Sequence, residues 1–176
     1  MHRKQILDLI SDYKMRFPNE MDTIDNIFDF VQENESCFHR ELSCGHLTGS
    51  AWILNADRSH VLLTHHRKLN IWVQLGGHAD GDSDIANVAM KEAREESGLE
   101  KLVFAQSGIY DIDIHKIPAR GKEAAHYHYD CRFLIQAADS NYIVSEESHD
   151  LKWIKREDVH ELSQEESLRR MVEKSY

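Results

Sequence analysis

Three glutamates that lie close together in the sequence are the clearest sign of chemistry in this chain. Glu92, Glu95 and Glu96 belong to the segment GGHADGDSDIANVAMKEAREESGL, residues 76–99. A polar, aspartate-rich loop leads into a predicted helix, which Gly98 is placed to end. At roughly 100° per residue, spacings of three and four residues keep the three carboxylates within an arc of about 100° on one helix face.

Neighbouring negative charges on a helix repel one another, so this face is expected to bind something positive. A divalent cation is the simplest candidate, because carboxylate oxygens suit hard Mg²⁺ or Mn²⁺ and such sites often include substrate phosphates. Ile85 and Val88 fall on the same face, so its first half is expected to pack on a core. A solvated acidic helix surface is the alternative interpretation.

A second set of polar residues alternates along two segments, 102–117 and 126–137, each of which is predicted to be a strand. One face of the first strand carries Asp111, Asp113 and His115. One face of the second carries His126, His128, Asp130 and Arg132. Because a short loop joins the strands, they are expected to lie side by side and form one polar wall. Such a wall could bind substrate, hold a second metal ion through histidine ligands, or supply a general base.

The ends of the chain are predicted to be helical. Apolar residues at helical intervals predict one helix over residues 2–16 and, after Pro18, a second helix that includes 21–31. These helices are expected to cover an edge or face of a sheet, or to form the surface of a homodimer. Ser163 and Glu166 have the spacing of a capping box, which predicts a terminal helix.

Two further strands are predicted between these regions. The apolar runs 49–54 and 60–66 are separated by NADRS, a typical hairpin connection. A basic patch overlaps and follows the second run; it consists of His65, His66, Arg67 and Lys68. A solvated loop and a phosphate contact are both consistent with this patch.

The 176 residues are enough for one domain with a substantial core. Lys plus Arg number 21 against 31 Asp plus Glu, a net charge of −10 that argues against binding nucleic acid or anionic membranes. No apolar run approaches the ~20 residues of a membrane helix, and the N-terminus lacks the apolar core of a signal peptide. The protein is therefore expected to be cytoplasmic, with its three cysteines reduced.

Residues 76–99 resemble the Nudix box, G-x5-E-x7-R-E-U-x-E-E-x-G-U, in which U is aliphatic. The residues in register are Gly77, Glu92, Ala93, Glu95, Glu96, Gly98 and Leu99. Ser83 stands where the motif has a glutamate, and Lys91 stands where it has an arginine. Asp82 and Asp84 flank Ser83 and could take over a carboxylate role. The motifs GGHADGD, DIDIH and HYHYD also resemble a bacterial His-rich Nudix subgroup.

This resemblance implies an α/β fold, the Nudix α/β/α sandwich with a mixed sheet, over residues 45–176. Residues 1–44 would then be an N-terminal helical segment packed on that domain. The implied activity is hydrolysis of a diphosphate linkage in a small nucleoside diphosphate derivative by a water molecule activated by Mg²⁺ or Mn²⁺. Expected metal ligands are Glu92, Glu95, Glu96 and the carbonyl of Gly76, and the expected proton acceptor is Glu95, Glu96 or a residue of the later loops.

The resemblance also implies which residues contact the phosphorylated substrate. Arg67, Lys68 and Arg132 carry donors that suit phosphate oxygens, and the family fold brings the end of the 60–66 strand close to the box. The remaining substrate-binding candidates are His115, His126, His128 and Asp130. Glu146 or Glu147, in an acidic loop, is expected to approach the metal.

Two other functions compete with hydrolysis. A Nudix-fold module that binds a nucleotide or metal without cleaving it is favoured by Ser83 and Lys91 and opposed by the three retained glutamates. Isomerase chemistry on an allylic diphosphate ranks lower, because the histidines of that isomerase family lie in a different motif. Since a fold does not determine the substrate, the group linked to the diphosphate stays open.

Overall fold

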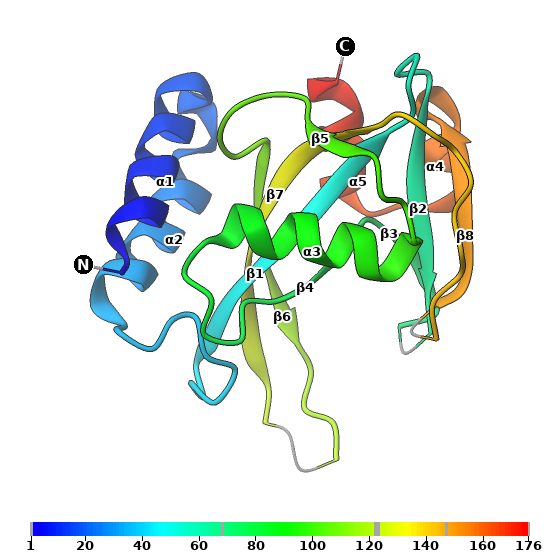
Figure 1. Ribbon diagram of the computed structural model, residues 1–176. Coiled ribbons are helices and arrows are strands. Elements are labelled where there is room, and N and C mark those ends of the chain that lie inside the picture. The colour runs from blue at the N-terminus through cyan, green and yellow to red at the C-terminus, as the bar shows by residue number, and fades with distance from the viewer. Residues whose placement is uncertain (1, 68, 122–123, 147, 176) are drawn as a thin grey trace.

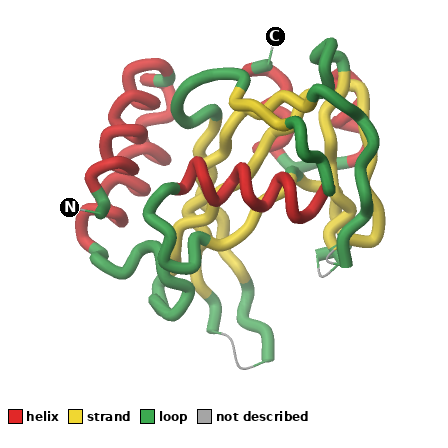
Figure 2. The backbone as a smooth tube through the Cα atoms, viewed as in Figure 1, coloured by secondary structure: helices red, strands yellow, loops and turns green. Residues whose placement is uncertain are grey.

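A computed structural model describes residues 2–67, 69–121, 124–146 and 148–175. Its centre is an eight-stranded mixed sheet between two layers of helices (Figures 1 and 2). One layer contains α1 (Lys4–Arg16), α2 (Met21–Glu33) and α3 (Ile85–Ser97), and the other contains α4 (Val159–Leu162) and α5 (Glu166–Lys174). The 3₁₀ turns are η1 (Pro18–Glu20) and η2 (Arg156–Asp158). The predicted α/β/α sandwich is confirmed.

Strand β1 is the centre of the sheet. It pairs in parallel with β7 along all ten of its residues and antiparallel with β2 and β4. The predicted hairpin is confirmed, since Ile53 lies opposite Leu62 and Leu54 opposite Val61. The strands are β1 (Gly45–Leu54), β2 (His60–His66), β3 (Ile71–Val73), β4 (Leu75–His78), β5 (Leu102–Phe104), β6 (Asp111–Ile117), β7 (His126–Ala137) and β8 (Ser148–Lys155).

The two faces of β1 are different environments, because successive side chains of a strand point to opposite faces. Leu47 points toward the α1–α3 layer, and Gly49 lies so close to α3 that an added Cβ would be 2.7 Å from the carbonyl oxygen of Ile85. Trp52 and Leu54 point to the opposite face and pack with α5. The remainder of that opposite face is polar and begins at His46.

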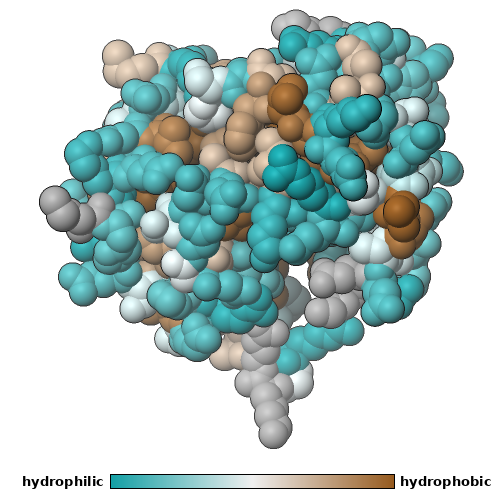
Figure 3. Space-filling view, viewed as in Figure 1, coloured by the Kyte–Doolittle hydropathy of each residue, from teal (hydrophilic) through white to brown (hydrophobic). Residues whose placement is uncertain are grey.

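The predicted N-terminal helices are confirmed, and they cover a face of the sheet. Their buried side chains, Ile10 and Ile27 among them, belong to one core cluster with Phe133 of β7 and Val88 of α3. The ring of Phe30 stacks on Tyr129 at a centroid distance of 3.7 Å. Figure 3 shows that the surface on the α3 side is largely hydrophilic, as the net charge of −10 leads one to expect.

The segment 102–117, predicted to be one strand, is two strands on the same edge of β7. Phe104 of β5 pairs with Ile135, and Asp111 of β6 pairs with Arg132. Between these two pairs β7 covers three residues, whereas the segment from Phe104 to Asp111 covers seven. The four extra residues loop out around Gly108, whose φ of 75° favours glycine.

Two other local predictions need correction. A single strand over 102–117 would place Tyr110 on the same face as Ile112. Tyr110 instead precedes β6 and packs under α5, where its hydroxyl donates to the carbonyl of Met171. Helix α5 begins at Glu166 without a capping box, since no side chain caps it. The Ser163 hydroxyl instead accepts from the amide of Glu165.

The cysteines of the described chain, Cys37, Cys44 and Cys131, are free thiols. No helix within the described residues is both long enough and apolar enough to cross a membrane.

Candidate functional site

The helix that carries the three glutamates is held at both ends by local hydrogen bonds. At its start, Asp84 accepts from the amide of Asn87, while Asp82 accepts from the amide of Asp84 and from the side chain of Asn87. At its end, Gly98 is left-handed (φ 68°) and its amide donates to the carbonyl of Arg94, as predicted. Asp82 and Asp84 therefore organise the turn into α3; that they could take over the role of the missing box glutamate stays a prediction.

Two of the glutamates face the glycines of β4. Glu96 is buried, and its Oε1 accepts from the amide of Gly76 at 2.8 Å. The carboxylate of Glu92 lies against Gly77, where an added Cβ would be 2.5 Å from Glu92 Cδ. Glycine is thus required at position 77 so that this carboxylate can approach the strand. The helix and the glycine strand together bring carboxylate oxygens of Glu92 and Glu96 against Gly77 and Gly76, and we call this group, with Glu95, the acidic site.

The third glutamate is open to solvent. The Glu95 side chain is 59% exposed, and its Oε1 lies 3.8 Å from Nζ of Lys91. An ion pair this exposed contributes little to stability, so the Glu95 carboxylate is available for a ligand at small cost. Ser83 is half-buried in the loop before α3. Lys91, the other departure from the box, forms this weak pair with Glu95.

The predicted polar wall is formed by β6 and β7. The two strands pair antiparallel, with Asp113 opposite Asp130 and His115 opposite His128. The face that carries them is the one opposite α3, because β7 shares its side-chain orientation with β1 in the parallel register. The wall divides into a charged end and an imidazole end.

The charged end is a buried ion network in which every charged group has a partner of opposite sign. The guanidinium of Arg132 is 3% exposed and contacts Asp130 at 2.8 Å, Asp111 at 3.2 Å and Asp113 at 3.3 Å. From α5, Arg170 and Lys174 reach Asp111 at 2.8 Å and 2.7 Å. We call these six residues the ion network: Asp111, Asp113, Asp130, Arg132, Arg170 and Lys174.

The charges of this network hold its acids ionised. Burial by itself raises the pKa of Asp111, but the hydrogen bond from Arg170 and the charge of Arg132 outweigh burial and lower it. Burial likewise raises the pKa of Asp113, and the hydrogen bond from His115 with the charge of Arg132 brings it well below its usual range. Both side chains are therefore carboxylates at neutral pH.

Two residues predicted to bind substrate, Arg132 and Asp130, belong to this buried network. Arg132, expected to contact phosphate, is 2% exposed and has its guanidinium directed at three carboxylates. Asp130 is 1% exposed and accepts from Thr48 and Ser50, each at 2.8 Å. The structure thus places both residues inside the protein, where Asp130 links β7 to β1 and Arg132 links β7 to β6. A buried cation with carboxylate partners is held by them.

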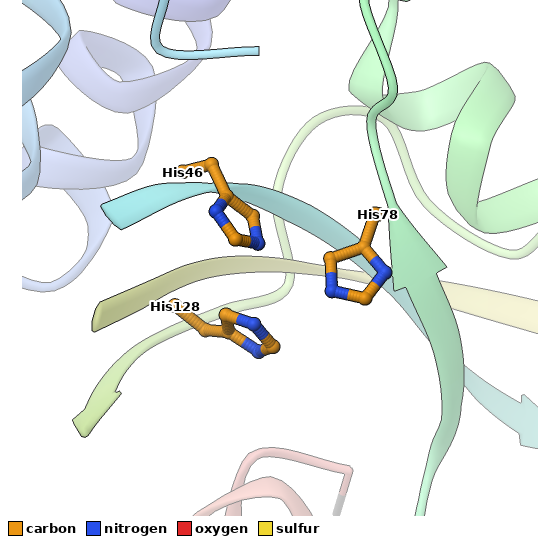
Figure 4. A group of neighbouring side chains, drawn as sticks. All are labelled: His46, His78 and His128. Carbon is orange, nitrogen blue, oxygen red and sulfur yellow. The ribbon is translucent and has the colours of Figure 1, made fainter. Parts of the chain in front are cut away.

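The imidazole end brings together histidines from three strands. His46 of β1, His78 of β4 and His128 of β7 each direct a ring into one shared space (Figure 4). Their ring centroids are 4.8–5.0 Å apart, and one ligand nitrogen from each lies within 4.8 Å of the others. We call these three residues the histidine cluster. His126 lies beside it, with Nε2 3.3 Å from Nε2 of His128.

Burial keeps two members of this cluster, His46 and His128, uncharged. Burial, with the nearby ring of His78, lowers the pKa of His46 to about 4. Burial and the same neighbour lower the pKa of His128 to about 2. A neutral imidazole presents a lone pair, so His46 and His128 each offer a nitrogen ligand at physiological pH. His115 stands between the two ends, with Nδ1 3.2 Å from Asp113 and its ring 5.4 Å from His128.

Sequence reasoning found only one member of this cluster. His128 was included in the polar wall, but His46 and His78 were not, because each stands alone on its own strand. The available signal was the strand pattern around them: His78 ends the glycine strand, which pairs antiparallel with the strand that His46 opens.

The basic patch is described in part. Arg67 is exposed, and its guanidinium donates to the carbonyl of Ser148 at 3.4 Å. Lys68 and Glu147, the other candidates of these two loops, lie outside the described residues, and Glu146 is exposed. His65 stacks on Trp72 at 5.1 Å and so belongs to the packing of the β2–β3 hairpin.

A sandwich that sets a capped acidic helix against a glycine strand defines the class of this protein. Residues 46–174 match the NUDIX domain family. The chain belongs to the Nudix family, whose members act on pyrophosphate bonds and generally use divalent metals. No curated protein matches it.

Solved structures share the fold at low identity. An Ap4A hydrolase from C. elegans is 19% identical, with a TM-score of 0.59 over 73% of this chain and 93% of that one. A NUDIX family hydrolase from Clostridium perfringens is 24% identical, with a TM-score of 0.56 over 74% and 95%. The E. coli dihydroneopterin triphosphate pyrophosphohydrolase is 17% identical, with a TM-score of 0.59 over 72% and 92%.

Proposed function

We propose that this protein hydrolyses a phosphoanhydride bond in a small nucleoside diphosphate derivative, with a divalent cation held at the acidic site. The observation that carries the proposal is the placement of Glu92 and Glu96 against Gly77 and Gly76, with Glu95 open beside them. The donors are hard oxygens, which fit Mg²⁺ or Mn²⁺. Glu92, Glu95 and Glu96 would hold the ion, with the carbonyl of Gly76 as a further ligand.

The residues of this site would have different roles in hydrolysis. A bound divalent ion would neutralise the diphosphate and make a water molecule more acidic. Glu96 fixes the distance between α3 and the glycine strand through its hydrogen bond to Gly76. Glu95 is solvent-facing and carries no strong partner, so it can accept the proton of the attacking water. Arg67 is exposed near β8 and is the described cation offered to the substrate phosphates.

Support for hydrolysis also comes from the fold relatives. Their printed names include an Ap4A hydrolase and a dihydroneopterin triphosphate pyrophosphohydrolase, both of which name phosphoanhydride substrates. At identities of 19% and 17%, these structures support the fold alone. The proposal of hydrolysis rests on the carboxylates of the acidic site.

Replacing Glu95 by Gln tests the proposal. Glu95→Gln removes a charge from an exposed side chain, so we expect an unchanged circular dichroism spectrum and at least a 100-fold loss of Mg²⁺-dependent phosphate release, beyond the ~10–100-fold typical of residues that only support a ligand. Activity would be measured on a panel of nucleoside diphosphate derivatives with Mg²⁺ or Mn²⁺. Glu100→Gln, an exposed glutamate after the helix, is the matched control.

A second variant moves a carboxylate without removing a charge. Gly77→Ala places a Cβ 2.5 Å from Cδ of Glu92, at the flexible end of that side chain, so the helix should stay folded while the carboxylate shifts. Hydrolysis should fall in this variant as well. Full activity in both Glu95→Gln and Gly77→Ala would overturn the assignment.

The rival function, binding without cleavage, rests on Ser83 and on Lys91, whose ammonium lies 3.8 Å from Glu95. Isothermal titration with the same nucleotide panel separates the two functions. Tight binding with no phosphate release from the wild-type protein would favour the binding module.

A further inference from the structure

The histidine cluster contains a polar group that the fold leaves unsatisfied. His46 is 1% exposed, and among the described residues neither of its ring nitrogens has a hydrogen-bond partner. A buried polar group without a partner costs free energy, and such groups in native proteins usually await an ion, a water molecule or a ligand. This cost falls at the start of the long parallel pairing of β1 with β7, where His46 lies opposite His128.

The surroundings of His46 supply further ligands. His78 and His128 are half-buried, come from two of the strands that pair with β1, namely β4 and β7, and bring their nitrogens within 4.8 Å of the His46 nitrogen. Figure 4 shows the three rings arranged around one space. A tetrahedral ion with metal–nitrogen bonds of about 2.0–2.1 Å holds its nitrogens roughly 3.3 Å apart. Small rotations of the two half-buried rings therefore complete the geometry.

The donor set indicates which metal this would be. All three ligands are imidazole nitrogens, and imidazole suits Zn²⁺ and neighbouring first-row transition ions, whereas Mg²⁺ prefers oxygen. The acidic site has the opposite preference. The two sites share β4, in which Gly77 faces Glu92 of α3 and His78 belongs to the cluster.

We propose that His46, His78 and His128 form a transition-metal site for Zn²⁺, separate from the acidic site. Three protein ligands leave a fourth position open to water or to an oxygen of a bound molecule, which is the arrangement of zinc sites that handle ligands. The half-buried rings of His78 and His128 leave this position accessible from the face opposite α3. The proposal does not depend on hydrolysis at the acidic site.

The first experiment uses the wild-type protein after removal of metals with a chelator. Titration with ZnCl₂ should show one tight site per chain, and MgCl₂ should not compete for it. Replacing Zn²⁺ by Co²⁺ should give the intense visible absorption of a tetrahedral ion, which requires no variant. A weak octahedral cobalt spectrum, or no zinc binding, would overturn the proposal.

Variants then locate the site. His78→Gln and His128→Gln should each weaken Zn²⁺ binding at least 100-fold, because loss of a ligand exceeds the ~10–100-fold effect of losing a supporting group. His160→Gln, a histidine of α4 far from the cluster in the sequence, is the matched control and should bind as the wild type does. Glu95→Gln should also keep the zinc site. Equal zinc affinity in both cluster variants, or loss of zinc binding in Glu95→Gln, would overturn the proposal.

Discussion

The ion network and the histidine cluster lie on the same face of the same sheet, but they satisfy their polar groups in opposite ways. Asp111 is fully buried and accepts from two cations of α5 and from Arg132. His46 is just as deeply buried and has no hydrogen-bond partner among the described residues. The network has internal partners for its charges, whereas His46 has none for its ring nitrogens among the described residues.

This difference distinguishes a region that stabilises the fold from a region that we propose binds a metal ion. A buried charge is tolerated only when it is paired, so we interpret the network as a set of ion pairs that holds α5, β6 and β7 together. A buried imidazole such as His46, without a hydrogen-bond partner among the described residues, costs free energy in the absence of a ligand. Residues of the same polar wall therefore have different roles, although their alternation in the sequence is the same.

Breaking the network should have the largest effect. Asp111→Asn leaves Arg132, Arg170 and Lys174 without a carboxylate that each of them contacts, so we expect a loss of about 3–5 kcal/mol in the free energy of unfolding. Urea denaturation measures it. The control is Glu173→Gln, which removes an exposed pair with Arg169 and should cost less than about 1 kcal/mol. A similarly small cost for Asp111→Asn would show that the network does not stabilise the packing of α5 on β6 and β7.

The pH dependence of stability should separate the two regions. The pKa of His46 is about 4 in the folded protein and about 6.5 when unfolded, so the unfolded chain takes up a proton first as the pH falls. The stability lost between pH 6.5 and 4 is at most about 3 kcal/mol, from a gap of 2.5 pH units. The acids of the network have lowered pKa values, so their contribution is present above pH 3.8 and is lost only below it.

Urea denaturation in the presence of a chelator, at pH values from 7.5 to 3, measures both windows. His46→Gln should reduce the slope between pH 6.5 and 4 and leave the slope below 3.8 unchanged. An unaltered slope in this variant would mean that His46 does not stay neutral in the folded protein.

The smallest effect is expected at the boundary between the regions. His115 contacts Asp113 of the network and lies 5.4 Å from His128 of the cluster, but its side chain is 42% exposed. His115→Gln should therefore cost less than about 1 kcal/mol and change zinc affinity less than about tenfold. Denaturation and zinc titration check both values. A large change in either would show that the two regions act as one unit.

Local patterns in the sequence predicted much of this protein. The spacing of Glu92, Glu95 and Glu96, with Gly98 behind them, predicted a capped acidic helix, and α3 has these limits. The apolar intervals of the first 31 residues predicted α1 and α2, and the alternation around Asp113 and His128 predicted two paired polar strands. These features depend on residues that are near one another in the chain, where the repeat of the backbone decides which side chains share a face.

Tertiary structure decided which residues pack against those helix and strand faces. The order of strands brought His46, His78 and His128 together, and the docking of α5 supplied the cations that enclose Asp111. Both outcomes depend on pairings between distant segments, such as Gly45 with Tyr127, which local periodicity does not encode. The sequence by itself determined the acidic helix and the polar strands, and the sheet register determined which polar residues became structure and which remained open to a ligand.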